Sequence, residues 1–177
     1  TLTSGATPSA HAEEHRRVRL ATRLASAVRA LLRTPADPAA TVARIALGAM
    51  ILPHGMQKLF GAFGGPGFDG EMALLTQTVG IPWIFAFLVI VAEFFGGVGL
   101  LLGLLGRAAA LGVGSVMVGA ALIGHVQHGF FMNWSGSLPA GAEGWEFHLL
   151  ALALVAIVIL RGSGAASLDR AISRHAN

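Results

Sequence analysis

The sequence predicts an all-α polytopic membrane protein, in which an antiparallel bundle of four transmembrane helices follows an N-terminal amphipathic helix at the membrane interface. Three observations predict this fold class. The 177-residue chain is 54% hydrophobic and 12% charged, whereas soluble domains carry about 25% charged residues. Four separate apolar segments follow one another along the chain. Eleven of the twelve Lys and Arg residues lie on one side of these segments, and Lys58 alone lies toward the other.

The four apolar segments have lengths close to that of a membrane crossing. They cover residues 41–60, 83–106, 108–127 and 145–160. A helix needs about 20 residues to cross the hydrocarbon core. The second and third segments meet this length, and the first and fourth are cleanly apolar over less, because their polar residues crowd one end. The connections 61–80 and 133–144 are rich in glycine and are predicted to be turns and irregular structure.

The distribution of basic residues predicts the orientation. Cytoplasmic loops of membrane proteins carry an excess of Lys and Arg, so both termini and the tight turn at Arg107 are expected in the cytoplasm. An even number of crossings agrees with this. We therefore expect a multi-pass protein of the bacterial inner membrane. Its parts are a cytoplasmic arm (1–40), a four-helix transmembrane domain (41–162) and a cytoplasmic tail (163–177).

Residues 13–34 are predicted to form a separate amphipathic helix. Its apolar residues recur at helical spacing, at Leu20, Leu24, Val28 and Leu31. Arginines lie mostly on the opposite side, at Arg16, Arg19, Arg23 and Arg33. A basic amphipathic helix favours the anionic inner leaflet, so membrane lipids are the expected partner, and docking to a cytosolic protein is the alternative. Pro35 and Pro38 then end this helix and begin the first span.

Glu93 is the most informative residue, because it stands near the middle of a stretch that otherwise lacks charge. A charged group in hydrocarbon costs about 3 kcal/mol on insertion scales, so it is expected to face the bundle interior and to have partners. Candidate partners lie toward the outer half of the other spans: His54 and Lys58, His125 and His128, Glu146 and His148. Lys58 is expected to pair with Glu146. A structural ion-pair network is the alternative to a functional site.

Several motifs resemble those of the DoxX family. The segment from His54 to Gly61 is similar to the first-helix motif of that family, and the segment from Ala92 to Gly97 is similar to its second-helix motif. The segments 146–152 and 167–169 resemble its last helix and tail. The resemblance implies a four-helix membrane protein that serves as a small subunit of a quinone-linked oxidoreductase. It places the family's matching positions at His54, Lys58, Glu93 and Glu146.

These residues are compatible with three main classes of function, and a small-solute transporter is a weaker fourth, because four helices form a pathway only as an oligomer. In a quinone-linked redox subunit, His54, His125 and Lys58 would hold the quinone, and Glu93 would relay protons, with Glu146 a further catalytic candidate. In a haem or metal protein, His54, His125 and His148 would be ligands. In an anchoring or assembly subunit, the polar residues would only stabilise the bundle.

Two kinds of chemistry are excluded or disfavoured. The chain has no cysteine, which excludes thiol–disulfide chemistry and cysteine-held clusters within it. It also shows no nucleic-acid-binding motif.

The partners we expect are other subunits of a membrane complex or further copies of this chain.

Overall fold

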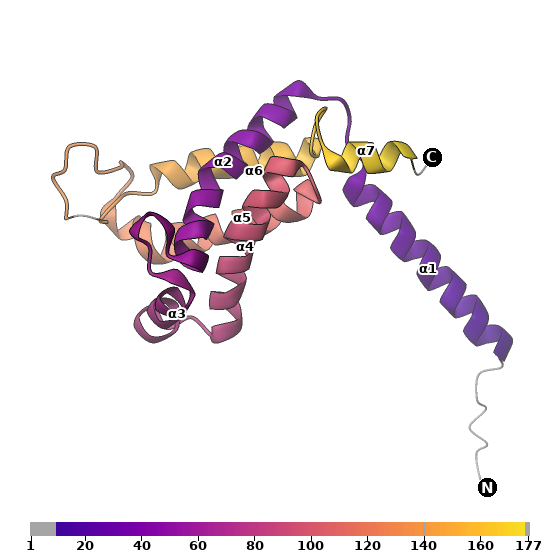
Figure 1. Ribbon diagram of the computed structural model, residues 1–177, viewed down its shortest axis with the longest axis horizontal. Helices are drawn as coiled ribbons and strands as arrows, with labels where there is room; N and C mark the ends of the chain where they lie inside the picture. Colours follow the sequence, from indigo (N-terminus) through magenta and orange to yellow (C-terminus); the bar gives the residue numbers. More distant parts are fainter. Residues whose placement is uncertain (1–9, 140, 176–177) are drawn as a thin grey trace, which may run out of the picture. The chain divides into compact units, whose positions relative to one another are not determined.

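The computed structural model describes residues 10–139 and 141–175, and this part of the chain is all-helical, as predicted (Figure 1). The chain divides into two compact units, one ending at Leu31 and the other beginning at Leu32. The described part of the first unit belongs to the helix α1 (Ala10–Leu32), whose last residue falls in the second unit, and this confirms a helix in the predicted region. The apolar side chains of Val18, Leu20, Val28 and Leu31 are all exposed. Its contact with a lipid surface stays a prediction.

The second unit contains four long helices, α2 (Pro38–Phe60), α4 (Trp83–Leu102), α5 (Gly106–Ala120) and α6 (Glu146–Arg161). A π-helical turn (Ala121–His125) and a 3-10 turn (Val126–His128) extend α5. Among the described residues, three helical stretches are long and apolar enough to cross a membrane: Pro38–Phe60, Trp83–Leu102 and Gly106–His128. A crossing by α6, which has 16 residues, stays a prediction.

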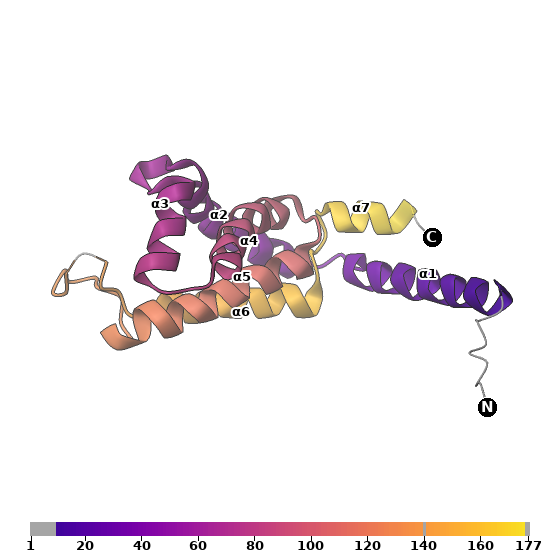
Figure 2. The same cartoon turned by 90° about the horizontal axis from the view of Figure 1, so that it is seen from below.

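The long helices pack in sequence around a common core. Helix α2 contacts α4, α4 contacts α5, α5 contacts α6, and α6 contacts α2. Figure 2 shows α5 and α6 running side by side. The core residues include Leu47, Ile51, Leu100, Val113 and Val158, all at most 1% exposed. In a bilayer such a core stabilises the fold through close packing, because lipid tails are as apolar as the side chains themselves.

Glycines allow α2 and α4 to approach closely. A Cβ atom at Gly55 would lie 2.5 Å from the backbone nitrogen of Phe94, and one at Gly97 would lie 3.0 Å from Leu52. On the side of α5, a Cβ at Gly96 would lie 3.2 Å from Val113. Gly96 and Gly97 therefore lie against neighbouring helices. Gly55 permits α2 to approach α4 at Phe94, the residue that follows Glu93.

Replacing Gly55 with alanine is expected to reduce the free energy of unfolding by about 1–3 kcal/mol, the typical cost of overpacking. The new methyl group would meet backbone atoms, which cannot rotate away, so the helices must separate. Gly119 in α5 is the matched control, because a Cβ there has open space around it. Unfolding by SDS titration in mixed micelles measures both variants. Equal stability of the two variants would contradict a close helix contact at Gly55.

The connection between α2 and α4 differs from the prediction of irregular structure. It contains a 3-10 turn (Ala62–Gly64), the helix α3 (Gly67–Ala73) and a π-helical turn (Leu74–Thr78). The prediction was wrong because the turn-forming glycines are concentrated before residue 68. After them, Phe68, Met72 and Leu75 recur at helical spacing. The described residues of the other connection, 133–144, contain no helix or strand, as predicted.

Helix α3 packs against α2 and α4. Met72 of α3 forms a second apolar cluster with Ala86 and Ile90 of α4, and Leu59 and Phe68 pack against it. We call the end of the helices at Phe60 and Trp83 the α3 end. The opposite end, at Pro38 and Leu102, is the α7 end, named for the helix α7 (Leu168–His175).

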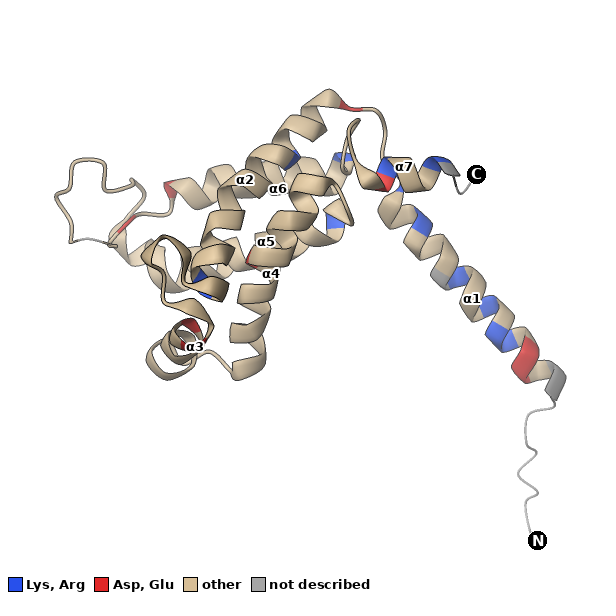
Figure 3. Ribbon diagram, viewed as in Figure 1, with Lys and Arg blue, Asp and Glu red and all other residues tan. Residues whose placement is uncertain are grey.

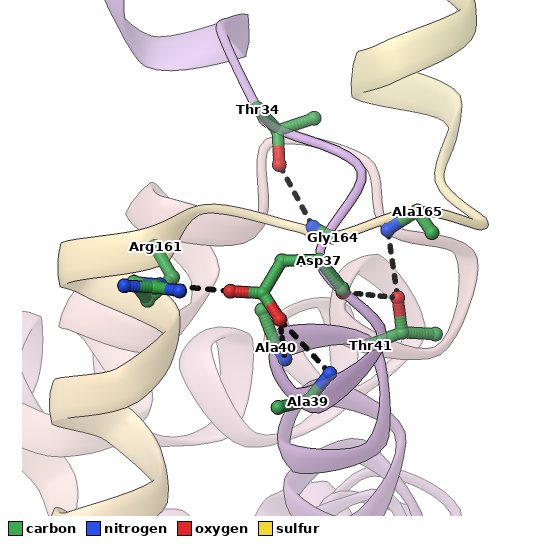
Figure 4. Close-up of polar contacts among 8 residues, drawn as sticks. All are labelled: Thr34, Asp37, Ala39, Ala40, Thr41, Arg161, Gly164 and Ala165. Carbon is green, nitrogen blue, oxygen red and sulfur yellow. Dashed lines mark hydrogen bonds and ion pairs between the residues drawn. The ribbon is translucent and has the colours of Figure 1, made fainter.

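Asp37 holds the linkers of the α7 end together (Figure 4). Its Oδ1 caps α2 by accepting the N–H groups of Ala39 at 2.9 Å and Ala40 at 3.2 Å. Its Oδ2 lies 2.8 Å from Nε of Arg161 at the end of α6. The hydrogen bond from Arg161 is the main cause that lowers the pKa of Asp37 below its ordinary value. Helix α2 begins at Pro38, as the sequence predicts.

Arg44 is a buried cation near the α7 end, only 1% exposed. Its guanidinium donates to the carbonyls of Ser163 at 2.8 Å and Leu101 at 2.7 Å, and also to those of Leu100 and Ala166. These carbonyls belong to the last turn of α4 and to the segment between α6 and α7. Arg44 therefore satisfies backbone acceptors that a helix end and a loop would otherwise bury unpaired.

Asp169 has the complementary role at the start of α5. Its carboxylate accepts the N–H of Leu105 at 2.7 Å, the N–H of Gly106 at 3.0 Å and the hydroxyl of Ser163 at 2.5 Å. Asp169 and Ser163 are each 1% exposed. The first part of the segment expected as a cytoplasmic tail is thus packed against the long helices, which ties α6 and α7 to the α4–α5 turn.

Candidate functional site

Glu93 forms an ion pair with Lys58 in the apolar interior. Nζ of Lys58 lies 2.8 Å from Oε2 of Glu93, and the two side chains are 20% and 5% exposed. Apart from this ion pair, Oε2 has no hydrogen-bond partner among the described residues. The long helices are otherwise almost uncharged through their middle stretches (Figure 3). The expectation that Glu93 faces protein and has a basic partner is confirmed.

The close contact of α2 and α4 explains why these two residues meet. Gly55 rests against the backbone of Glu93 and Phe94, and Lys58 follows Gly55 by three residues, so both lie on the same face of α2. Removing two charges from water costs several kcal/mol for each ion. The pair therefore persists because each charge offsets the other, and Lys58 keeps part of its surface exposed.

Glu71 is a third charged residue of this site, and the sequence interpretation missed it. It lies on α3 and is 5% exposed. Burial raises the pKa of Glu71, the ammonium of Lys58 lowers it, and the carboxylate of Glu93 raises it further, with a net increase. We call Lys58, Glu71 and Glu93 the Lys58 cluster. A signal in the sequence could have indicated Glu71. Phe68 lies three residues before it, and this spacing places the two residues on one face of a helix, so that Glu71 lies on the same face as an apolar side chain.

His54 lies one turn before Lys58 on the same face of α2, as predicted. Its side chain is exposed, although α2 is one of the helices long and apolar enough to cross a membrane. The other described residues of the chain therefore leave this imidazole uncovered. It stands at the edge of the Lys58 cluster, accessible to a molecule approaching from outside the chain.

The expected pair of Lys58 and Glu146 is wrong. Within the described part of the chain, the ion-pair partner of Lys58 is Glu93. Glu146 is the first residue of α6, and its Oε2 accepts the N–H of Met132 at 3.0 Å. The loop before α6 turns back onto this residue, so the carboxylate satisfies loop backbone. Lys58 instead meets the carboxylate across the close α2–α4 contact.

His125, at the end of the π-helical turn after α5, and His148 of α6 form a second polar group. Their ring centroids are 4.4 Å apart with planes tilted by 47°. Nδ1 of His125 lies 2.8 Å from the carbonyl oxygen of Glu143, and because a carbonyl only accepts, Nδ1 carries the proton. His148 is 6% exposed, and its Nδ1 has no hydrogen-bond partner among the described residues.

The structure brings together two of the three predicted metal ligands, His125 and His148. His54 lies instead beside Lys58. In the part of the chain that the structure describes, no group of three or more His, Asp or Glu side chains is placed to hold a metal ion. The two polar groups are thus separate, one on α2, α3 and α4, the other on α5, α6 and the loop between them.

Comparison with known proteins identifies one family. The DoxX family model matches residues 39–126, from the first turn of α2 through the π-helical turn after α5. The matched range contains the whole Lys58 cluster together with His54 and His125. It does not include Glu146 or Asp169, so the expected likeness of their segments to the last helix and tail of that family stays a prediction. No curated protein and no solved structure gives a significant match to the chain.

Proposed function

Because the chain belongs to the DoxX family of membrane proteins, we propose that it is an integral membrane subunit of a quinone-linked oxidoreductase whose polar site is the Lys58 cluster. The observation that carries the proposal is the ion pair between Lys58 and Glu93, buried on apolar helices. Ionisable residues within the membrane commonly mark substrate pathways and proton relays. Their insertion into hydrocarbon costs free energy, so such residues are rare where they have no function.

The residues around the ion pair suit a quinone head group. A quinone presents two carbonyl oxygens, which need hydrogen-bond donors. The ammonium of Lys58 has three N–H donors, and only part of this capacity faces Glu93. The imidazole of His54, one turn away and exposed, offers another donor. The carboxylate of Glu93, whose Oε2 lies 2.8 Å from Nζ of Lys58, is the group in this site that can accept a proton. A bound quinone would supply the two-electron chemistry.

Aromatic rings border the same site. The ring of Phe94 lies 5.1 Å from the ring of Phe60 and 5.1 Å from that of Phe95, edge to face in both cases. Phe60 and Phe95 are 64% and 61% exposed. Phe94 directly follows Glu93, and Phe60 follows Lys58 by two residues. A flat ring that reaches the polar residues from the lipid would therefore meet aromatic surface beside them.

A binding experiment tests this proposal on the full chain in lipid nanodiscs. Quinone co-purifying with the protein is quantified first, and a short-chain benzoquinone then serves as the titrated probe. Lys58→Met and Glu93→Gln are each expected to weaken binding at least about 10-fold, equivalent to about 1.4 kcal/mol. Asp69→Asn, an exposed carboxylate change on α3, is the control and should bind like the wild type.

Two outcomes count against a quinone site at the Lys58 cluster. One is the absence of any co-purifying quinone together with no saturable binding of the probe. The other is a probe affinity that is the same in the wild type and in both cluster variants, which would place the quinone elsewhere.

An anchoring or assembly subunit is the second candidate function. The exposed apolar and basic side chains of α1 favour it, because this helix has the composition of a docking element. Deleting residues 1–33 would then release a soluble partner from the membrane without changing quinone binding. In the quinone-linked subunit, loss of binding accompanies changes at the Lys58 cluster instead.

A further inference from the structure

The charges of the Lys58 cluster do not balance. Two carboxylates, Glu71 and Glu93, accompany one ammonium, that of Lys58, and both carboxylate residues are at most 5% exposed. If all three groups were ionised, the cluster would carry a net negative charge in a region of low dielectric. Such a charge is expensive, and buried carboxyl groups avoid it by binding a proton. One additional proton makes the cluster neutral.

We propose that Glu71 and Glu93 share this proton, and that Glu71 passes it between Glu93 and the water at the α3 end. The inference rests on the proposed function for the reaction that delivers the proton to Glu93. It adds to that function a proton-transfer residue on α3 and a direction of exit.

The packing of α3 places Glu71 beside the ion pair. Met72, the next residue, contacts the cluster that contains Ile90, and Ile90 lies one turn before Glu93 on α4. Leu59, the neighbour of Lys58, packs against the same cluster. This apolar cluster brings α2, α3 and α4 together beside Glu71, Lys58 and Glu93. No hydrogen bond joins Glu71 directly to Glu93 in the described residues, but the charges of Lys58 and Glu93 both act on Glu71, so the proton would pass between the two carboxyl groups through water.

The transfer itself moves only a proton. Protonated Glu93 and ionised Glu71 become ionised Glu93 and protonated Glu71, and Glu71 then releases the proton to water. No bond other than O–H changes, and the net charge of the cluster is unchanged by the first step. Nζ of Lys58 lies 2.8 Å from Oε2 of Glu93, so Lys58 favours the ionised form of Glu93 and drives the proton toward Glu71. The exposed side of α3, at Asp69 and Gly70, borders the solvent that receives the proton.

The groups that face Glu71 determine its titration. Lys58 comes from α2 and Glu93 comes from α4, while Asp69 on its own helix is exposed. Because the pKa of Glu71 is raised in the folded protein, the protonated form stabilises the fold. This contribution is fully present below the ordinary pKa of a glutamate and decreases as the pH rises through the raised value.

Infrared spectroscopy of the full chain in nanodiscs tests the shared proton without any quinone. The C=O stretching band of protonated carboxylic acid is followed during a pH titration. In the wild type, the band should persist to a higher pH than in either Glu71→Gln or Glu93→Gln. Each substitution is expected to lower the midpoint by at least about one pH unit, the coupling at which two sites titrate as a unit. Asp69→Asn should leave the midpoint unchanged.

Superimposable titrations of the wild type and Glu71→Gln would overturn the proposal, because they would show that Glu71 holds no part of the proton. If Glu71→Gln does not fold, Glu93→Gln decides the same question, since an unshifted midpoint there is equally incompatible with sharing. Glu71→Asp, which keeps the carboxyl group, should retain most of the wild-type behaviour. A shared proton together with no quinone binding would refute the proposed function alone.

Discussion

Replacing Lys58 with methionine is expected to reduce the free energy of unfolding by about 3–5 kcal/mol at neutral pH, the usual cost of removing one partner of a buried ion pair. The substitution keeps the length of the side chain and removes its charge. Glu93, whose side chain is 5% exposed, then loses its counter-ion, and Glu71 loses the ammonium that attracts it. SDS-induced unfolding of the purified chain, monitored by its tryptophan fluorescence, measures the change.

The double variant Lys58→Met/Glu93→Leu separates stability from function. Replacing both partners of a buried pair with apolar residues is often neutral or stabilising. We therefore expect the double variant to recover most of the stability that Lys58→Met loses, and still not to bind the quinone probe. Additive losses in the two single variants and the double variant would contradict coupling between these residues.

The membrane helices could be predicted from the sequence because their signals are local. The length of an apolar segment indicates a membrane helix without reference to the rest of the chain. In the same way, Pro35 and Pro38 indicate where one helix ends and the next begins. The resulting predictions for the second and third spans agree with α4 and the extended α5. The burial of Glu93 was also predictable, because a lone charge within an apolar helix has few stable placements.

The partners within the site could not be predicted in the same way. The choice of Glu93 over Glu146 for Lys58 depends on how closely α2 approaches α4, and Gly55 determines that distance through a contact between segments far apart in the sequence. Glu71 was missed because its helix begins after a run of glycines that indicates turns. The role of Asp169 was not predictable either, since two of its three donors, the N–H groups of Leu105 and Gly106, lie 64 and 63 residues away in the sequence.

The two ends of the long helices differ in how their polar groups are satisfied. At the α7 end, Arg44 and Asp169 bond mainly to backbone groups of turns and helix ends. Toward the α3 end, the carboxylate of Glu93 pairs with the ammonium of Lys58, and the buried carboxyl group of Glu71 lies on the adjoining helix α3. Backbone contacts hold a fold, whereas side-chain carboxyl groups beside one another in an apolar interior can exchange a proton. This contrast is why we assign structure to one end and chemistry to the other.

Replacing Asp169 with alanine is therefore expected to affect the fold and not the site. The side chain of Asp169 is buried, since this residue is only 1% exposed. Its removal would leave three donors without their acceptor: the N–H groups of Leu105 and Gly106 and the hydroxyl of Ser163. Each buried donor left unpaired costs about 1–3 kcal/mol, so we expect a loss of at least about 3 kcal/mol of unfolding free energy. Leu105 increases the effect, because its positive φ of 51° depends on the turn that the carboxylate holds.

The comparison that isolates this role uses three variants of α7. Asp169→Asn keeps one acceptor oxygen and should lose less stability than Asp169→Ala. Arg174→Gln, an exposed change on the same helix, should remain within about 0.5 kcal/mol of the wild type. The infrared titration of the Lys58 cluster should be the same in any Asp169 variant that folds. A shift of that titration would mean that the two ends are coupled, and a stable Asp169→Ala would mean that the α4–α5 turn holds its conformation without the carboxylate.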